Sequence, residues 1–224
     1  KTHNINEKKA RNSFIDLLNI GPGKRVLDLA CGTGRDTEII ARRIGKGGEI
    51  FASDISSDML RRSRKRLKKC ACSKHFSLVN AISLPFEDKY FDAVYSFGGL
   101  GEFSDIRTSL AEMVRITKVG GKIVVGDESI APWLRSTEFA EILAVTNPQF
   151  KAHVPLKAIN VEAREVRLQW VINGVFYLID FQVGKGEPTA NFDFIIPGSR
   201  GGTYGTRYEG RLEGCRRKRK SLRI

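Results

Sequence analysis

The sequence predicts an α/β fold in which a doubly wound, mostly parallel sheet of seven strands ends in an antiparallel β-hairpin. Short apolar runs alternate with helical or loop-like stretches through residues 6–145, which is the pattern of βα units around a parallel sheet. After residue 162, two strand-like runs flank Asn173-Gly174, the dipeptide that most favours a tight type I′ turn. We therefore expect the chain to complete its sheet with an antiparallel pair.

The apolar periodicity and the turn residues between its runs place each element. Gly21-Pro22-Gly23 ends the first helix, and Ser56 followed by Asp58 marks a helix start. Helices are expected at residues 6–18, 35–44, 57–69, 105–117 and 136–145, with Gly120-Gly121 ending the fourth segment. Strands are expected at residues 25–30, 49–54, 76–79, 91–97 and 122–126, and the hairpin strands at 164–172 and 175–183.

The composition is that of a soluble globular protein, with 41% hydrophobic and 28% charged residues. No apolar run approaches the roughly 20 residues of a membrane span, and no secretory signal is visible, so we expect a cytoplasmic protein. The four cysteines are too few and too unevenly placed for a disulfide framework. Cys70, Cys72 and His75 form C-x-C-x-x-H without a fourth ligand at zinc-site spacing, so no metal is predicted.

The stretch VLDLACGTGRD joins the first strand to a turn that contains Gly32 and Gly34. Ligands of open parallel sheets bind beyond the carboxyl ends of the strands, and glycine allows a ligand to approach the backbone. Asp54 ends the next strand, where a carboxylate accepts hydrogen bonds from a ribose diol. This arrangement predicts a site for an adenosine-containing ligand.

Two further residues distinguish among adenosine ligands. Thr37 occupies the position of the third glycine in a dinucleotide fingerprint, which argues against a nicotinamide-dependent oxidoreductase. Asp28 places a negative charge before the turn, which disfavours a pyrophosphate and favours a ligand with a cationic centre.

VLDLACGTG resembles the first motif of the class I S-adenosylmethionine-dependent methyltransferases. FASDIS, VNAISLPFEDKYFDAVYS and EMVRITKVGGKIVV resemble the later motifs of that family, in the same order and spacing. The resemblance covers about residues 6–127 and is closest to the small-molecule branch that includes quinone-biosynthesis C-methyltransferases. It implies a Rossmann-like fold, S-adenosyl-L-methionine as cofactor and a small acceptor of aromatic or lipid-like character.

The resemblance also implies roles for individual residues. Asp28 is expected to hold the methionine ammonium, directly or through water, and Asp54 the ribose hydroxyls. Asn80 replaces an aspartate of the family pattern, and its amide oxygen can still accept a hydrogen bond from the adenine amino group. For these residues the alternative is a purely structural capping or turn role. The expected cofactor-binding residues are Asp28, Ala30, Cys31, Gly32, Gly34, Asp54, Ile55, Asn80, Ala81 and Ser96.

Methyl transfer from a sulfonium is an in-line displacement, so the protein mainly positions the reactants and no catalytic residue type is obligatory. A general base helps when the acceptor is a hydroxyl or an acidic carbon. Candidate bases are Glu102, Asp127, Glu128 and His153, each of which also has a structural interpretation.

Two sequence features bear on a nucleic-acid acceptor. Asn147-Pro148-Gln149-Phe150 is similar to a base-methyltransferase motif, but it follows the fifth strand instead of the fourth and is interpreted as a helix-ending turn. No cysteine follows a proline, as the nucleophile of cytosine C5 enzymes does. Both features disfavour a nucleic-acid base as acceptor. The Gly-rich stretch around Arg200, Tyr204 and Arg207 fits either a loop that closes over an acceptor or an exposed hairpin.

The net charge of +13 lies in two runs, because residues 61–69 contribute +7 and residues 211–224 contribute +6. The neutral remainder argues against a protein built throughout to bind nucleic acid. The two runs leave open contacts with phosphate, an anionic membrane surface or an acidic substrate. We expect one domain over residues 1–210, made of a first helix (6–18), a cofactor half (25–127), a hairpin (164–183) and a Gly-rich extension (184–210), followed by a basic tail (211–224).

Three alternatives to a small-molecule methyltransferase remain at this point. The first is an RNA or protein methyltransferase recruited by the two basic runs. The second is a nicotinamide-dependent oxidoreductase, and the third is a binding module that keeps the fold without turnover. The sequence makes no prediction about the oligomeric state.

Overall fold

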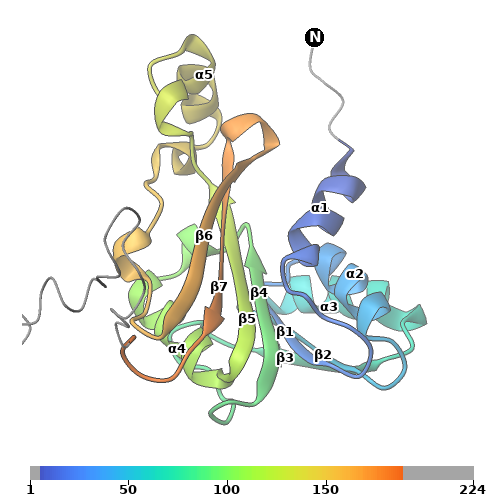
Figure 1. Cartoon of the computed structure of the whole chain (residues 1–224). Helices are drawn as coiled ribbons and strands as arrows, with labels where there is room; N and C mark the ends of the chain where they lie inside the picture. The colour runs from blue at the N-terminus through green and yellow to red at the C-terminus, as the bar shows by residue number, and fades with distance from the viewer. Residues whose placement is uncertain (1–5, 189–224) are drawn as a thin grey trace, which may run out of the picture. The chain divides into compact units, whose positions relative to one another are not determined.

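The computed structural model describes residues 6–188. The compact unit that contains the sheet ends at Gly186. Seven strands form one sheet in the order β3-β2-β1-β4-β5-β7-β6 (Figure 1). The strands from β3 to β5 pair in parallel, whereas β7 runs antiparallel to both β5 and β6. The expected fold class is confirmed. The expectations for the Gly-rich extension after residue 188 and for the basic tail lie outside the described residues.

The helices and strands follow the expected order. The helices are α1 (Glu7–Asp16), α2 (Arg35–Ile44), α3 (Ser57–Arg66), α4 (Ile106–Ile116) and α5 (Glu138–Thr146). The strands are β1 (Arg25–Leu29), β2 (Glu49–Asp54), β3 (Ser73–Leu78), β4 (Phe91–Phe97), β5 (Thr117–Glu128), β6 (Ala163–Val171) and β7 (Phe176–Val183). Short 3₁₀ helices are η1 (Leu67–Lys69), η2 (Leu100–Glu102), η3 (Pro132–Leu134), η4 (Pro148–Lys151), η5 (Leu156–Ala158) and η6 (Ile172–Gly174).

Local side-chain chemistry fixes several element ends. Ser56 accepts a hydrogen bond from the Met59 amide and caps α3 as expected, while Asp105 caps α4 in the same way. Asn173 and Gly174 both have positive φ, and the Val175 amide donates to the Ile172 carbonyl, which is the geometry of a type I′ turn. The hairpin is therefore directed by its own turn residues.

Two strands begin three or more residues away from the predicted position. β3 begins at Ser73, three residues earlier than expected, because its polar first half pairs with β2 at the sheet edge. β5 begins at Thr117, five residues early, where we expected a helix end and a loop. Thr117 pairs with Phe91, and the register then shifts before Lys122 pairs with Ala93. Periodicity does not reveal such an irregular strand start, because pairing and not burial defines it.

Both faces of the sheet are buried. Neighbouring residues of β1 point to opposite faces, so Val26 joins the cluster of Phe14 and Ile40 on the side of α1 and α2. Leu27 joins the opposite cluster, which includes Leu110 of α4. This two-sided burial explains the continuous apolar run of β1. Among the described residues, no helix combines the length and the apolar character needed to cross a bilayer.

Gly34 allows α2 and α3 to approach each other, which gives a stability prediction. Its φ is +78°, and a Cβ atom there would lie 2.5 Å from Ser63 Oγ and 3.1 Å from Ser63 Cα. Gly34→Ala should lower the free energy of unfolding by roughly 2–4 kcal/mol, through left-handed strain and overpacking. Urea denaturation measures this change.

Gly21→Ala is the matched control, because a Cβ at Gly21 meets nothing within 4 Å. We expect its stability to equal or slightly exceed that of the unchanged chain. Equal stabilities for the two variants would contradict the packing role of Gly34.

Candidate cofactor site

A cavity of about 400 Å³ lies at the carboxyl ends of β1, β2 and β4. The strand order changes direction between β1 and β4, so this is the topological switch point at which α/β sheets bind ligands. Ala30 follows β1, Asp54 ends β2, and Gly98 and Gly99 follow β4. Six predicted cofactor residues line the cavity: Ala30, Gly32, Asp54, Ile55, Asn80 and Ala81.

Two backbone amides hold the carboxylate of Asp54 at the wall of this cavity. One carboxylate oxygen accepts from the Gly32 amide at 2.8 Å, and the other accepts from the Ser56 amide at 2.8 Å. Only 8% of the residue is exposed. Each carboxylate oxygen can accept a second hydrogen bond, so the fixed carboxylate retains capacity for a diol.

The turn after β1 leaves its inner side open. A Cβ placed on Gly32 would meet nothing within 4 Å, so a ligand can lie against this backbone. Gly99 has the opposite surroundings, since a Cβ there would lie 2.6 Å from the Ala30 Cβ. The lack of a side chain at residue 99 therefore lets the loop after β4 pack on the end of β1, and both loops border the cavity.

Asp28 lies behind the turn and not on the cavity wall. It is 2% exposed and accepts a hydrogen bond from Thr37 Oγ1 at 2.5 Å. Burial raises the pKa of Asp28 well above its ordinary value, and the charge of nearby Asp36 adds to this. A cationic ligand group nearby would favour the ionised form of Asp28. The binding of an ammonium group by Asp28 stays a prediction.

Three other expected cofactor residues do not line the cavity. Cys31 is buried, and burial raises the pKa of its thiol. Gly34 packs against α3 as described above. Ser96 is fully buried, and its hydroxyl lacks a hydrogen-bond partner among the described residues. A contribution from these positions can come only through the backbone or through neighbouring residues.

Asn80 lies at the rim, with an exposed side chain. Its Oδ1 accepts from the Ile82 amide at 3.2 Å, which fixes the amide and leaves one lone pair and two N–H donors available. The cavity is also lined by four residues that were not predicted from the sequence: Met59, Val79, Phe103 and Ser104. Of these four, Met59 could have been predicted from the sequence, because it lies in the first turn of the helix that follows Asp54.

The structure brings three of the four candidate bases together beside this cavity. Glu102 lines the cavity and accepts a hydrogen bond from the Gln149 side chain. Asp127 accepts from the amides of Gly101 and Glu128 at 2.5 and 2.8 Å. The fourth candidate, His153, does not line the cavity, and its ring lies 3.4 Å from an Arg135 nitrogen.

Glu128 forms, with Glu102 and Asp127, what we call the acidic cluster, and its pKa is strongly shifted. A hydrogen bond with Asp127, followed by partial burial, raises the pKa of Glu128 to about 7, and the charges of Asp127 and Glu102 add to the shift. A carboxyl group with such a pKa exchanges its proton near neutral pH, as a general base requires.

Cys70, Cys72 and His75 do not form a metal-binding cluster in the part of the chain that the structure describes. His75 Nε2 lies 3.3 Å from a Glu49 carboxylate oxygen, and the imidazole stacks on Phe51.

Comparison with known proteins identifies the family. The sequence model of the ubiE/COQ5 methyltransferase family matches residues 3–140. This chain belongs to that family. The assignment confirms the resemblance found in the motifs and removes the oxidoreductase alternative.

The relatives that match include two proteins named ubiquinone/menaquinone biosynthesis C-methyltransferase UbiE. Those of Bordetella avium (strain 197N) and Burkholderia cenocepacia (strain HI2424) are each 41% identical to this chain over 111 residues. The match covers 50% of this chain, but only 43% and 46% of the respective relatives. The matched part is thus less than half the length of these relatives.

Solved structures show the same fold at low sequence identity. The YcgJ protein of Bacillus subtilis has a TM-score of 0.59 and 16% identity, over 80% of this chain and 100% of that one. Geranyl diphosphate C-methyltransferase from Streptomyces coelicolor A3(2) has a TM-score of 0.60 and 15% identity, over 79% and 80% of the two chains. Phosphoethanolamine N-methyltransferase 2 of Haemonchus contortus has a TM-score of 0.63 and 12% identity, over 79% and 53%.

The raised pKa of Glu128 predicts a pH-dependent stability. The folded chain binds this proton more tightly than the unfolded chain, whose glutamate titrates near 4.5. The free energy of unfolding should therefore fall, through this group, as the pH rises from about 4.5 to about 7.

Glu128→Gln imitates the protonated form and should remove this loss. After allowance for the partial exposure of Glu128, we expect the variant to gain on the order of 1–2 kcal/mol relative to the unchanged chain between pH 4.5 and pH 8. Urea denaturation at both pH values measures it. A stability difference that stays constant with pH would contradict the assignment.

Proposed function

We propose that this chain transfers a methyl group from S-adenosyl-L-methionine to a ring carbon of a small aromatic acceptor of the kind used in quinone biosynthesis. The observation that carries this proposal is the cavity at the switch point, with the fixed carboxylate of Asp54 on its wall. The family assignment and the names of the relatives support the reaction class and the acceptor class.

The residues around the cavity fit the parts of the cofactor. We assign the ribose hydroxyls to Asp54, because its oxygens are oriented and retain lone pairs. Apolar Ile55, Met59 and Val79 provide a surface for the adenine, beside the polar amide of Asn80. A volume of about 400 Å³ falls in the range of small-molecule sites.

When bound, the cofactor supplies an electrophilic methyl group on a sulfonium centre. The chain then has to hold the acceptor carbon in line with that methyl and exclude water. Glu102, Phe103 and the Gly98–Gly99 backbone form the part of the wall beyond β4, and we assign the acceptor to this end.

C-methylation also requires a proton acceptor. As the sulfur–methyl bond breaks and the carbon–carbon bond forms, the ring carbon must lose its proton. Glu102 on the wall is the proposed first acceptor, and Glu128 behind it can hold a proton near neutral pH. The acidic cluster thereby provides both proximity and a suitable pKa.

Cofactor binding gives the first test. Asp54→Asn should weaken binding of S-adenosylhomocysteine by at least roughly tenfold, because the amide loses one acceptor oxygen and the charge assistance of the other. Isothermal titration calorimetry measures the affinity. Asp58→Asn is the control, since Asp58 is exposed on α3 and lies outside the cavity wall. Equal affinities for the two variants, or no binding by the folded unchanged chain, would refute the cofactor assignment.

The acceptor requires a separate experiment. The full chain is incubated with methyl-labelled cofactor and a cell extract, and the label is followed into lipid, RNA and protein fractions. We expect the label in an organic-soluble aromatic product with a new carbon–methyl bond, and a markedly lower yield of this product with Asp54→Asn when the cofactor is below saturation. Label confined to RNA or protein would favour the alternative in which the basic runs recruit a macromolecule.

A further inference from the structure

A second cavity, which we call the α1–α2 groove, lies between α1, α2 and the end of α3. Its volume is about 560 Å³, against about 400 Å³ for the cofactor cavity, and the two share no lining residue. Two carboxylates, Glu7 and Glu38, lie in its wall. Six cations line it as well: Lys8, Arg11, Arg35, Arg42, Arg43 and Arg66.

Two of these cations have clear structural roles. Arg11 pairs with both oxygens of Asp36 at 2.9 and 2.8 Å and with Glu7 at 2.8 Å. Arg43 pairs with Asp16 at 2.8 Å and donates to the Asn12 carbonyl. Both side chains are about three-quarters buried. They join α1 to α2, and the carboxylates that they contact balance their positive charges.

Three other arginines are more exposed and less fully paired. The side chains of Arg35, Arg42 and Arg66 are 56%, 70% and 38% exposed. Arg35 and Arg42 each make one ion pair, and Arg66 lies 3.6 Å from Glu38 while its Nε donates to the Thr33 carbonyl. A guanidinium has five N–H donors, so most donors of these three groups have no protein partner within the described residues.

The charge pattern of the groove is unlike that of ordinary helix surface pairs. Glu7 is shared by Arg11 and Arg35, and Glu38 is shared by Arg42 and Arg66. Each groove carboxylate thus faces two guanidinium groups, whereas a typical surface pair matches one charge with one. Lys8 forms no ion pair within residues 6–188, so the positive charge of the groove is not neutralised locally.

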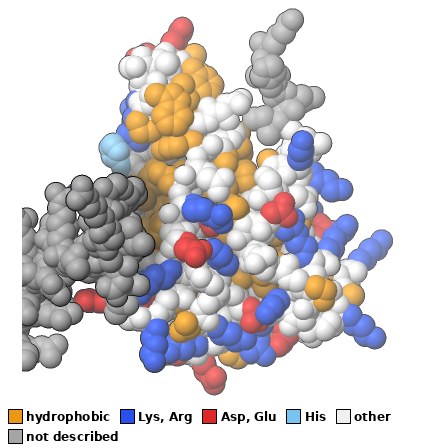
Figure 2. Space-filling model, in the orientation of Figure 1, with side chains coloured by type: hydrophobic (Ala, Val, Ile, Leu, Met, Phe, Trp, Pro, Cys, Tyr) orange, Lys and Arg blue, Asp and Glu red, His pale blue; other side chains and the backbone are white. Residues whose placement is uncertain are grey.

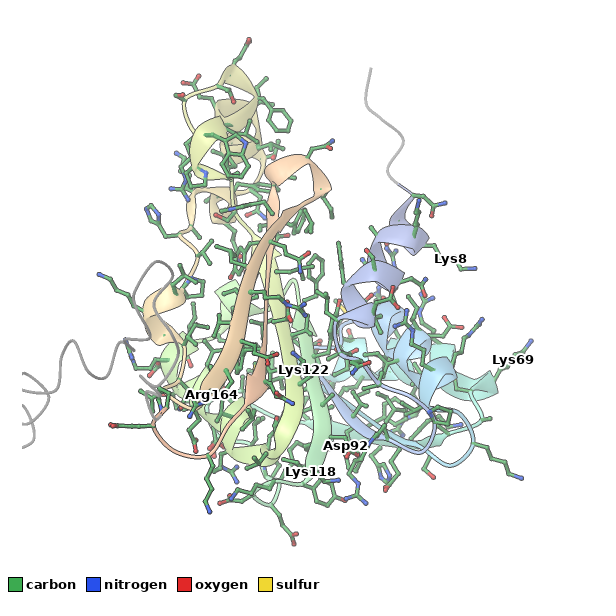
Figure 3. The ribbon with its side chains drawn as sticks, in the orientation of Figure 1. Lys8, Lys69, Asp92, Lys118, Lys122 and Arg164 are labelled. Atoms are coloured by element: carbon green, nitrogen blue, oxygen red, sulfur yellow. The ribbon has the colours of Figure 1, made fainter. Side chains whose placement is uncertain are left out.

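The surroundings increase this positive field. Figure 2 shows Lys and Arg side chains gathered over the side of the molecule formed by α1, α2 and α3. Lys8 on α1 and Lys69 at the end of η1 both point outward on this side (Figure 3). Residues 61–69 of the neighbouring helix segment contain seven cations, of which Arg66 lines the groove itself. A groove with such an excess of positive charge concentrates anions.

We propose that the α1–α2 groove binds a small molecule that carries phosphate groups. The contacting residues are Arg35, Arg42 and Arg66, with Lys8, and their spare N–H donors can bind phosphoryl oxygens. Several cations line this one cavity, so a compact ligand with several negative charges suits it. A diphosphate is such a ligand. A long polyanion fits less well, because the chain is neutral outside its two basic runs.

The groove adjoins the cofactor cavity through the turn after β1. Arg66 donates to the carbonyl of Thr33 at 2.9 Å, and Arg35 directly follows Gly34 in the chain. Gly32, on the other side of the same turn, lines the cofactor cavity. The proposed phosphate site is therefore a neighbour of the cofactor site but consists of different residues, and it does not depend on the proposed methyl transfer.

The test is a calorimetric titration of the full chain with inorganic pyrophosphate at constant ionic strength, with inorganic phosphate as a second probe. We expect saturable binding of one pyrophosphate per chain. Arg35→Gln combined with Arg42→Gln should weaken it at least roughly tenfold. Arg61→Gln combined with Lys65→Gln removes the same charge from α3 outside the groove and should change the affinity less than about twofold.

Three results would overturn the proposal: no pyrophosphate binding, equal weakening by the two double variants, or affinity for RNA alone that both double variants reduce equally. The last result would assign a general polyanion surface to the basic helices instead. The far-UV circular dichroism spectrum of each variant shows whether the fold is intact. If the groove variant does not fold, Lys8→Gln is used, with an expected loss of several-fold in pyrophosphate affinity.

Discussion

The carboxylate of Asp54 joins two neighbouring strand ends, and the geometry of the cofactor cavity depends on this connection. A buried carboxylate is costly unless several donors satisfy it. Here the donors are backbone amides of Gly32, in the turn after β1, and Ser56, at the start of α3. The same two hydrogen bonds therefore pay the desolvation cost, shape the turn and hold the carboxylate at the cavity wall.

A network of buried charges lies behind that turn. Asp28 bonds to Thr37, and Asp36 bonds to Arg11 and to the Tyr95 hydroxyl. Burial raises the pKa of both aspartates, and Arg11 opposes the shift at Asp36. Because Arg11 belongs to α1 and Asp36 to α2, this ion pair joins the two helices, while the apolar face of α1 packs against the sheet. Arg11 of this ion pair also lines the α1–α2 groove.

The segment after β5 reaches the opposite side of the cofactor cavity. The Ile130 amide donates to the Phe150 carbonyl, and Gln149 donates to Glu102 on the cavity wall. The turn at residues 147–150, which ends α5 as the sequence predicted, thus also positions a proposed proton acceptor. The same four residues therefore end a helix and hold a side chain of the cavity wall in place.

The order of the elements, the helix cap at Ser56, the hairpin at Asn173-Gly174 and the turn at Gly32 follow from the amino-acid sequence alone. These features depend on residues close together in the chain, whose conformational preferences persist in any context. Tertiary packing sets which site residues face the cavity, where β3 and β5 begin, and which helices bring arginines to one groove. Periodicity predicts which side of an element is buried, but it does not specify which distant side chains meet there. The contacts Arg11–Asp36 and Glu102–Gln149 span 25 and 47 residues, so they exist only once the helices and loops have packed.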